Sequence, residues 1–583
     1  MHASRDLFSQ RIETSSEQYA WWDAETRGNW LWGYTMMAFL SGHSEHQARV
    51  LTLLRQLQAA QDLDGYLGIY SPASRYHHGS GENGELWAQS RALLALLTAY
   101  EFTHDDTFLH SVEAAARLTM RHYSAERSYF RKPEHPLALL VGVTHGLCYV
   151  DVMEWLYSLT NDETYRDFGV WLYDDFSSLP IPFANDDLSL RSLSDPYRPM
   201  SGHAVHTAEH LRVLAWAYRV TGREDLRVAL DAAQQKLSRY ILPNGVLIGD
   251  ESIHGLPSPD IGYEYCTITE QLFSLASLLQ KFGQHADQIE SLLFNAGQGA
   301  RLPDGTGISY LTTDTRLDAR ADRPDSYSYF HGSHGRFKFS PTHEDVACCC
   351  NPNATRLLSH YVSHQWFHTT DGTGIVAVLY GACTVRTTLS DVEVEIEEVT
   401  NYPFDEMVTF MIRPQMPLRF RLLLRVPGWA RSLHLTLNGG AIEAVTNEHG
   451  FVVIEREWRM DDQLEMSFDV SIDLRPYPGG EYAIFRGALQ YVLPVENEFR
   501  PLKHYNHATL RDLEVRPQHL EAAYRPLILK AERPSYGCTL HRTGVAGSWD
   551  NPGLQLAIDD MTLVPMGNAV LRRAAFPLWQ GDK

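Results

Sequence analysis

The chain has 583 residues, with 50 Lys and Arg against 72 Asp and Glu, and 44% of its residues are hydrophobic. A chain of this length and composition can form two or more domains with sizeable cores. Its formal charge of −22 argues against nucleic acid or an anionic membrane surface as a partner and favours a neutral or cationic substrate. The sequence contains no apolar run long enough to span a membrane and no basic segment followed by an apolar one at its start, so we expect a cytoplasmic protein.

The first part of the sequence has the pattern of paired helices. Apolar residues recur at helical spacing over 85–103 and predict one buried face. Thr103, Thr160 and Thr221 each end such a stretch, and a polar turn and a new amphipathic stretch follow each of them. This repeat predicts helical hairpins that close into a ring or stack as a solenoid.

Around residue 365 the pattern changes to that of β-strands. Segment 392–396 alternates Val and Ile with Glu, and segment 418–426 alternates apolar residues mostly with Arg. This alternation, together with frequent turn residues, predicts antiparallel sheets arranged as a sandwich. We therefore expect a helical domain over 1–370 and a β-sandwich region of two subdomains over 371–583. One helix near 352–364 returns to the helical domain.

Seven cysteines lie at positions 148, 266, 348, 349, 350, 383 and 538. An odd number, with three consecutive, is a poor basis for disulfides and favours metal binding or thiolate chemistry. Zinc binds thiolates, imidazoles and carboxylates in tetrahedral sets, and the segment 351–353 offers the turn that adjacent cysteines need. Glu264 and Cys266 are the best candidates for a second ligand pair. Three small buried apolar residues remain the alternative interpretation of the cysteine run.

Further candidates lie on the loop 249–266, which is rich in Gly and Pro. It carries four ionisable side chains, Asp250, Glu251, His254 and Asp260. Loops at the end of a helical ring commonly hold an active site, although a solvated acidic loop would have the same composition. His145 and His203 stand at predicted helix starts, where a histidine either packs or binds a ligand.

Taken together, these segments resemble glycoside hydrolase family 127, the β-L-arabinofuranosidase family. The resemblance extends over nearly the whole chain and rests on motifs at 61–70, 84–87, 202–205, 263–266, 349–353, 424–429 and 438–439. The double cysteine before Pro-Asn, paired with an upstream Glu-x-Cys, is the most specific of them. The resemblance implies a multidomain α+β protein, with an (α/α)6 helical barrel as catalytic domain followed by antiparallel β-sandwich domains. It also implies a Zn²⁺ site that holds a cysteine nucleophile.

Carried over by motif, the resemblance implies Cys349 as the nucleophile and Glu251 as the general acid and base. The implied zinc ligands are Glu264, Cys266, Cys349 and Cys350, and the implied substrate-binding residues are His145, His203, Tyr310 and Arg91. Arg91 stands where the family usually has a sugar-contacting histidine. Because a guanidinium favours anionic groups, an acidic or otherwise modified sugar is open as the substrate.

The resemblance thus implies a retaining exo-glycosidase, similar to β-L-arabinofuranosidases, that acts on a plant-type or related saccharide or glycoside. We expect burial to raise the pKa of Glu251, so that it is an acid at neutral pH. One alternative is a glycosidase with structural zinc, in which Glu251 works with Asp250 or Asp260. The others are a non-catalytic carbohydrate-binding protein and hydrolysis by zinc-bound water, against which four protein ligands argue. The sequence leaves a homodimer open.

Overall fold

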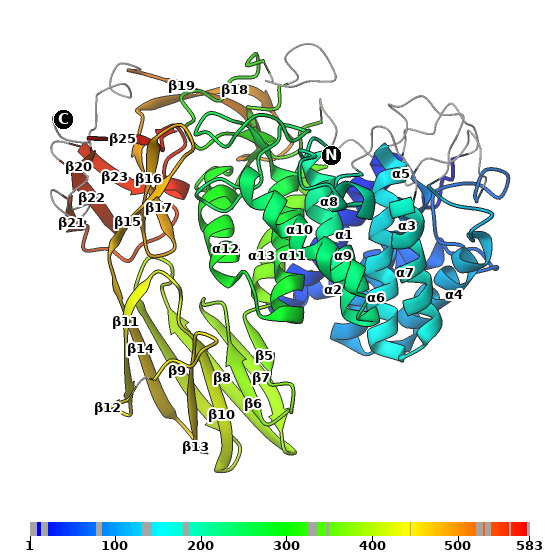
Figure 1. Cartoon of the computed structure of the whole chain (residues 1–583), viewed down its shortest axis with the longest axis horizontal. Helices are drawn as coiled ribbons and strands as arrows, with labels where there is room; N and C mark the ends of the chain where they lie inside the picture. Colours follow the sequence, from blue (N-terminus) through cyan, green and yellow to red (C-terminus); the bar gives the residue numbers. More distant parts are fainter. Residues whose placement is uncertain are drawn as a thin grey trace.

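The computed structural model describes residues 8–12, 21–76, 84–130, 141–178, 186–324, 335–344, 349–443, 445–519, 529–530, 538–558 and 561–579. In Figure 1 a group of packed helices lies beside two β-rich parts. None of the described helices is both long and apolar enough to cross a lipid bilayer.

In the described chain, six helices form a closed inner ring. They are α1 (Trp21–Leu40), α3 (Glu85–Thr103), α6 (Tyr149–Thr160), α9 (Ala204–Thr221), α11 (Tyr265–Phe282) and α13 (Cys350–Val362). Each packs on the next, and α13 packs on α1 to close the ring. Outside them pack α2 (Ser44–Ala59), α4 (Asp106–His122), α7 (Glu163–Ser178), α10 (Glu224–Leu237) and α12 (Ala286–Ser291), and the short α5 (Val141–His145) and α8 (Leu190–Ser194) lie in connections. This confirms the expected helical barrel.

The predicted repeat has a common structural cause. Thr103, Thr160 and Thr221 are the last residues of α3, α6 and α9, and each hydroxyl donates to the carbonyl four residues earlier at 2.6–2.7 Å. Each hydroxyl also accepts from the backbone N–H two residues later. The intervening residue, His104, Asn161 or Gly222, adopts a left-handed conformation that ends the helix. The same type of helix terminus therefore leads the chain three times from a helix of the inner ring to an outer helix.

A β-sandwich follows the barrel, as expected. One sheet has the order β12 (Gly440–Ile442), β11 (Ala430–Leu437), β14 (Asp462–Val470), β9 (Met407–Pro414), β8 (Val392–Thr400), β7 (Cys383–Leu389). The other has the order β13 (Phe451–Trp458), β10 (Leu418–Arg425), β6 (Gly374–Ala377), β5 (Trp366–His368). Val394 and Ile396 are buried, as their alternation with Glu predicted. The pairing of β6 with β10 is parallel and departs from the antiparallel prediction.

The last part of the chain forms a second β region and reaches back to the barrel. Its main sheet contains β15 (Ile472–Pro476), β16 (Glu481–Arg486), β17 (Leu489–Pro494), β20 (Leu529–Lys530), β21 (Cys538–Arg542), β22 (Leu554–Ile558), β23 (Met561–Pro565), β24 (Arg572–Arg573) and β25 (Phe576–Trp579). The hairpin of β18 (Asn497–His504) and β19 (Arg511–Pro517) runs along the top of Figure 1. Strand β19 pairs with β4 (Phe339–Ser340), and β4 pairs with β2 (Ile308–Ser309). The C-terminal region thus supports a barrel segment, and the division at residue 370 stays a prediction.

Candidate active site

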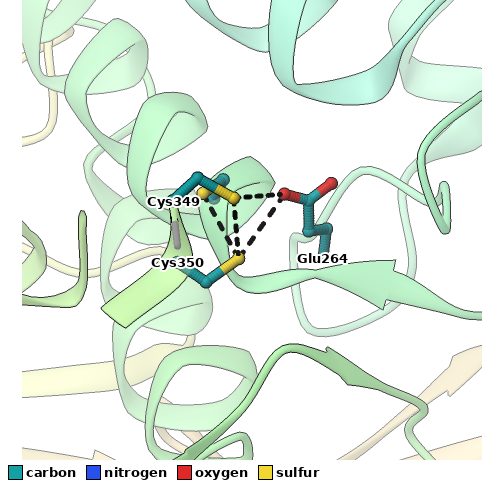
Figure 2. Close-up of side chains that lie close together, drawn as sticks. Glu264, Cys349 and Cys350 are labelled. Carbon is teal, nitrogen blue, oxygen red and sulfur yellow. Dashed lines mark hydrogen bonds between the residues drawn. The ribbon is translucent and has the colours of Figure 1, made fainter. Parts of the chain in front are cut away.

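The predicted metal ligands meet where two inner helices begin. Cys350 is the first residue of α13 and Cys349 is its N-cap, while Glu264 is the N-cap of α11 and Cys266 is its second residue. Because α11 and α13 pack side by side, the four side chains come together, and Figure 2 shows Glu264, Cys349 and Cys350 facing one another. Cys350 Sγ lies 3.3 Å from Cys266 Sγ and 3.5 Å from Glu264 Oε1, and Cys349 Sγ lies 3.7 Å from the same oxygen. The third cysteine of the run, Cys348, lies outside the described residues.

These four side chains could hold a metal ion. Their ligand atoms all lie within 4.8 Å of one another, and three of the four residues are buried. The Glu264 Oε2 atom is buried and has no hydrogen-bond partner among the described residues, where His203 Nε2 lies 3.7 Å from it. A buried carboxylate oxygen without a hydrogen bond is costly, and a cation would offset that cost.

A short backbone pairing brings Glu251 to His203. The N–H of Ala204 donates to Glu251 O at 2.7 Å, and the N–H of Ile253 donates to Gly202 O at 2.8 Å. His203 is the N-cap of α9, and its Nε2 lies 2.9 Å from Glu251 Oε2. Glu251 has φ of 105°, which costs backbone energy in a residue other than glycine and commonly marks a functional position.

Tyr310 connects the carboxylate to the cysteines. It precedes β3 (Leu311–Thr312), which pairs with β1 (Tyr263–Glu264) so that Leu311 lies opposite Glu264. The Tyr310 hydroxyl oxygen lies 3.3 Å from Cys349 Sγ and 3.5 Å from Glu251 Oε1. One hydroxyl therefore contacts both groups that the sequence singled out for chemistry.

The electrostatics of the cluster favour a thiolate at Cys349. Hydrogen bonds with Cys266 and Cys350, together with one to Tyr310, outweigh burial and hold the pKa of the Cys349 thiol well below its ordinary value. Burial raises the pKa of Cys266 and of Cys350 well above theirs. Burial and the nearby Glu251 carboxylate raise the pKa of Glu264. Negative charge thus collects on the one sulfur that Tyr310 also contacts.

The expectation of a raised pKa at Glu251 is wrong. Burial does push the pKa of this carboxyl upward, but the hydrogen bond from His203 and the ion pair with Arg336 outweigh burial and lower the pKa to about 2. Arg336 Nη1 contacts Glu251 Oε1, the atom that also faces Tyr310. In this structure Glu251 is therefore a carboxylate held by two basic side chains.

His145 lies next to His203, and Arg91 lies buried in the interior of the barrel. His145 ends α5 instead of starting a long helix, and its ring centre is 6.2 Å from that of His203. Arg91 has a fully buried side chain whose Nη2 lies 3.4 Å from Glu209 Oε2 and 3.3 Å from Glu270 Oε1. With two carboxylates at its guanidinium and no exposed surface, Arg91 is not placed to contact a sugar directly.

The other ionisable residues of the loop are not among the described side chains whose ligand atoms cluster with Glu251 and His203. Asp250 is buried, with Oδ1 3.5 Å from His254 Nδ1, and Asp260 is exposed. The carboxylate grouped with Glu251 and His203 is Glu264, since one ligand atom from each of the three lies within 4.8 Å of the others. A two-carboxylate mechanism could therefore use Glu264 as the partner of Glu251.

Three residues of this region were not found from the sequence. His206 and Glu209 belong to α9, where they lie three and six residues after His203 on a helix that is buried on nearly all sides. Polar residues at that spacing on an apolar helix are a usable signal for a buried polar cluster. Arg336 lies outside any long element and has no such signal, because only the folded chain brings it to Glu251.

Comparisons with known proteins agree with this architecture. Residues 5–242 match the family model of the β-L-arabinofuranosidase GH127 catalytic domain, and residues 374–470 match that of the GH127 middle domain. A GH127 β-L-arabinofuranosidase from Geobacillus stearothermophilus T6 is 18% identical with a TM-score of 0.67, covering 96% of this chain and 91% of its own. A structure described as a glycoside hydrolase is 18% identical, with a TM-score of 0.68 and coverage of 99% and 94%. A GH127 β-arabinofuranosidase is 16% identical, with a TM-score of 0.67 and coverage of 98% and 91%. No curated protein sequence matches the chain.

Proposed function

Because the chain belongs to glycoside hydrolase family 127, the β-L-arabinofuranosidase family, we propose that it is a retaining exo-glycosidase with Cys349 as its nucleophile. The observation that carries this proposal is the shared hydroxyl of Tyr310, which contacts both Cys349 and Glu251. In retaining glycosidases the nucleophile and the acid stand close together, with carboxyl groups about 5 to 5.5 Å apart. A sulfur and a carboxylate that contact one hydroxyl likewise lie on the same side of the site and close to each other.

The first step forms a bond from Cys349 Sγ to the anomeric carbon and breaks the bond from that carbon to the leaving oxygen. Glu251 gives a proton to this oxygen, which departs as an alcohol. In the second step Glu251 takes a proton from water, the water oxygen bonds to the anomeric carbon, and Cys349 leaves as a thiolate. The sugar thus keeps its anomeric configuration after two displacements.

Glu264, Cys266, Cys349 and Cys350 would hold zinc, because three thiolates and a carboxylate suit this metal better than Mg²⁺ or Ca²⁺. A zinc ion bound there would supply the positive charge that makes Cys349 a better leaving group in the second step. The chain's own contribution is the set of hydrogen-bond partners at Cys349, which favours the thiolate before any substrate arrives.

Glu251 must carry a proton when the leaving group departs, although it is a carboxylate in this structure. His203 lies within hydrogen-bond distance and can share a proton with it, while Arg336 covers Glu251 Oε1. We infer that a bound glycoside displaces Arg336 and places its leaving oxygen at that atom. Without the guanidinium, burial again raises the pKa of Glu251 and makes it an acid.

The proposal is tested with aryl and alkyl glycosides, including β-L-arabinofuranosides and uronic acid derivatives. Cys349→Ser should abolish turnover, and mass spectrometry should find one sugar on Cys349 in wild type caught with a slow substrate. Cys383→Ser, on β7 of the sandwich, is the control and should retain full activity. A sugar trapped on a carboxylate, or normal turnover by Cys349→Ser, would refute the cysteine mechanism and favour Glu251 with Glu264.

Glu251→Gln separates the acid from the nucleophile. The variant should lose most activity on alkyl glycosides, whose leaving groups need a proton, and keep more on activated aryl glycosides. Equal losses on both substrates would assign the acid to another residue. An intact fold with no glycosidase activity in wild type would favour a carbohydrate-binding protein instead.

A further inference from the structure

A buried carboxylate stands behind His145. Glu209 Oε1 lies 2.8 Å from His145 Nδ1. The side chain of Glu209 is fully buried, whereas that of His145 keeps 7% of its surface exposed beside His203. Glu209 therefore stands behind the histidine ring, on the side of His145 that faces the barrel interior.

The charges of this pair fix which nitrogen of His145 carries the proton. Burial opposes ionisation of Glu209, but its contacts with His145 and His210 keep the pKa of the carboxyl well below its ordinary value. Burial also lowers the pKa of His145, which favours the neutral ring. A neutral ring beside a carboxylate holds its one proton on Nδ1, so Nε2 becomes a hydrogen-bond acceptor.

Arg91 stabilises both partners of the histidine. Its Nη2 lies 3.4 Å from Glu209 Oε2, and the guanidinium carbon lies 3.8 Å from the centre of the Trp87 ring. Trp87 in turn stacks on His145, with ring centres 4.2 Å apart and planes 26° apart. One buried cation thus supports the hydrogen bond to Nδ1 and the aromatic surface under the ring.

We propose that Glu209 and Arg91 are positioning residues that hold His145 as an Nε2 acceptor for a hydroxyl group of the bound sugar. This inference rests on the proposed glycosidase function and gives Arg91 a role that needs no contact with substrate. A group that fixes the tautomer and the tilt of a ring acts in the way second-layer partners of metal-bound histidines do. This arrangement predicts that the enzyme prefers a sugar whose hydroxyl donates to His145 Nε2 over the analogue that lacks this hydroxyl.

The test compares wild type with Glu209→Gln, His145→Ala and the double variant on an aryl glycoside. Glu209→Gln keeps the shape but removes the charge that fixes the tautomer, so kcat/KM should fall by roughly tenfold to hundredfold. The preference for the sugar that carries this hydroxyl over its deoxy analogue should fall together with kcat/KM. Because Glu209 acts through His145, the double variant should be no worse than His145→Ala alone.

Asp151→Asn is the matched control. Asp151 is a buried carboxylate on α6 that pairs with Arg212 at 2.7 Å, and it belongs to the same charged interior as Glu209. Asp151→Asn should lower the melting temperature, as we also expect of Glu209→Gln. It should leave the preference for the sugar over its deoxy analogue unchanged. Losses that add in the double variant, or an unchanged preference in Glu209→Gln, would overturn the inference. A wild type that cleaves no glycoside would overturn the proposed function, and this inference with it.

Discussion

The ion pair between Arg336 and Glu251 offers the sharpest test of how the acid is controlled. The pKa of Glu251 is about 2, against an ordinary value of 4.5, so the difference corresponds to roughly 3 kcal/mol. His203 and Arg336 share this effect against burial. Removing Arg336 should abolish of the order of half of this lowering, which raises the pKa of Glu251 by roughly one unit or more.

The variant is Arg336→Gln, and the assay is kcat/KM against pH on an alkyl glycoside. Because the first step needs protonated Glu251, activity falls as pH rises through the pKa of this carboxyl. The high-pH limb should therefore move upward by about one unit, and activity on that limb should rise about tenfold. Arg323→Gln is the control, since Arg323 pairs with Asp318. A limb that stays in place or moves downward would refute the assignment of Arg336.

Three further outcomes follow from the described contacts. Removing the metal with a chelator should stop turnover and leave Cys349 as the thiol that iodoacetamide alkylates first at neutral pH, which peptide mapping would show. Glu270→Gln should destabilise the fold by about 3 to 5 kcal/mol in urea unfolding, because Arg356 would lose its buried carboxylate and Arg212 would lose one of its two. The pKa of Glu251 is lowered on folding, so its contribution to stability should be complete above about pH 4.5 and be lost as pH falls towards 2. The wild type and Glu251→Gln should therefore converge in stability on acidification, and parallel curves would contradict the ion pair.

Local patterns of the sequence predicted the elements well. The helix Glu85–Thr103 has its predicted bounds, and the three threonine ends recur because each repeats one set of backbone hydrogen bonds. Alternation predicted the strands of the sandwich, but it carries no information on strand direction, which is why the parallel pairing of β6 and β10 was missed.

The candidate site was predictable only where its residues carry a motif. Cys349, Cys350, Glu264 and Cys266 stand at two helix starts, and the packing of those helices brings them together. The charge state of Glu251 was not predictable, since it depends on Arg336, a residue distant in sequence. For the same reason Arg91 could be recognised as unusual but not assigned to the interior, where Glu209 and Glu270 neutralise it.

Closure of the inner ring has a consequence for biosynthesis. Helix α1 and helix α13 lie at opposite ends of the barrel sequence, yet they pack on each other, and Cys349 and Cys350 belong to the last of these helices. The segment that must close to join them is long, so their contact is non-local and its formation is opposed by chain entropy. A nascent chain that has not yet reached α13 cannot assemble the thiol cluster, and the ribosome must release the final helix before any metal or sugar can be bound.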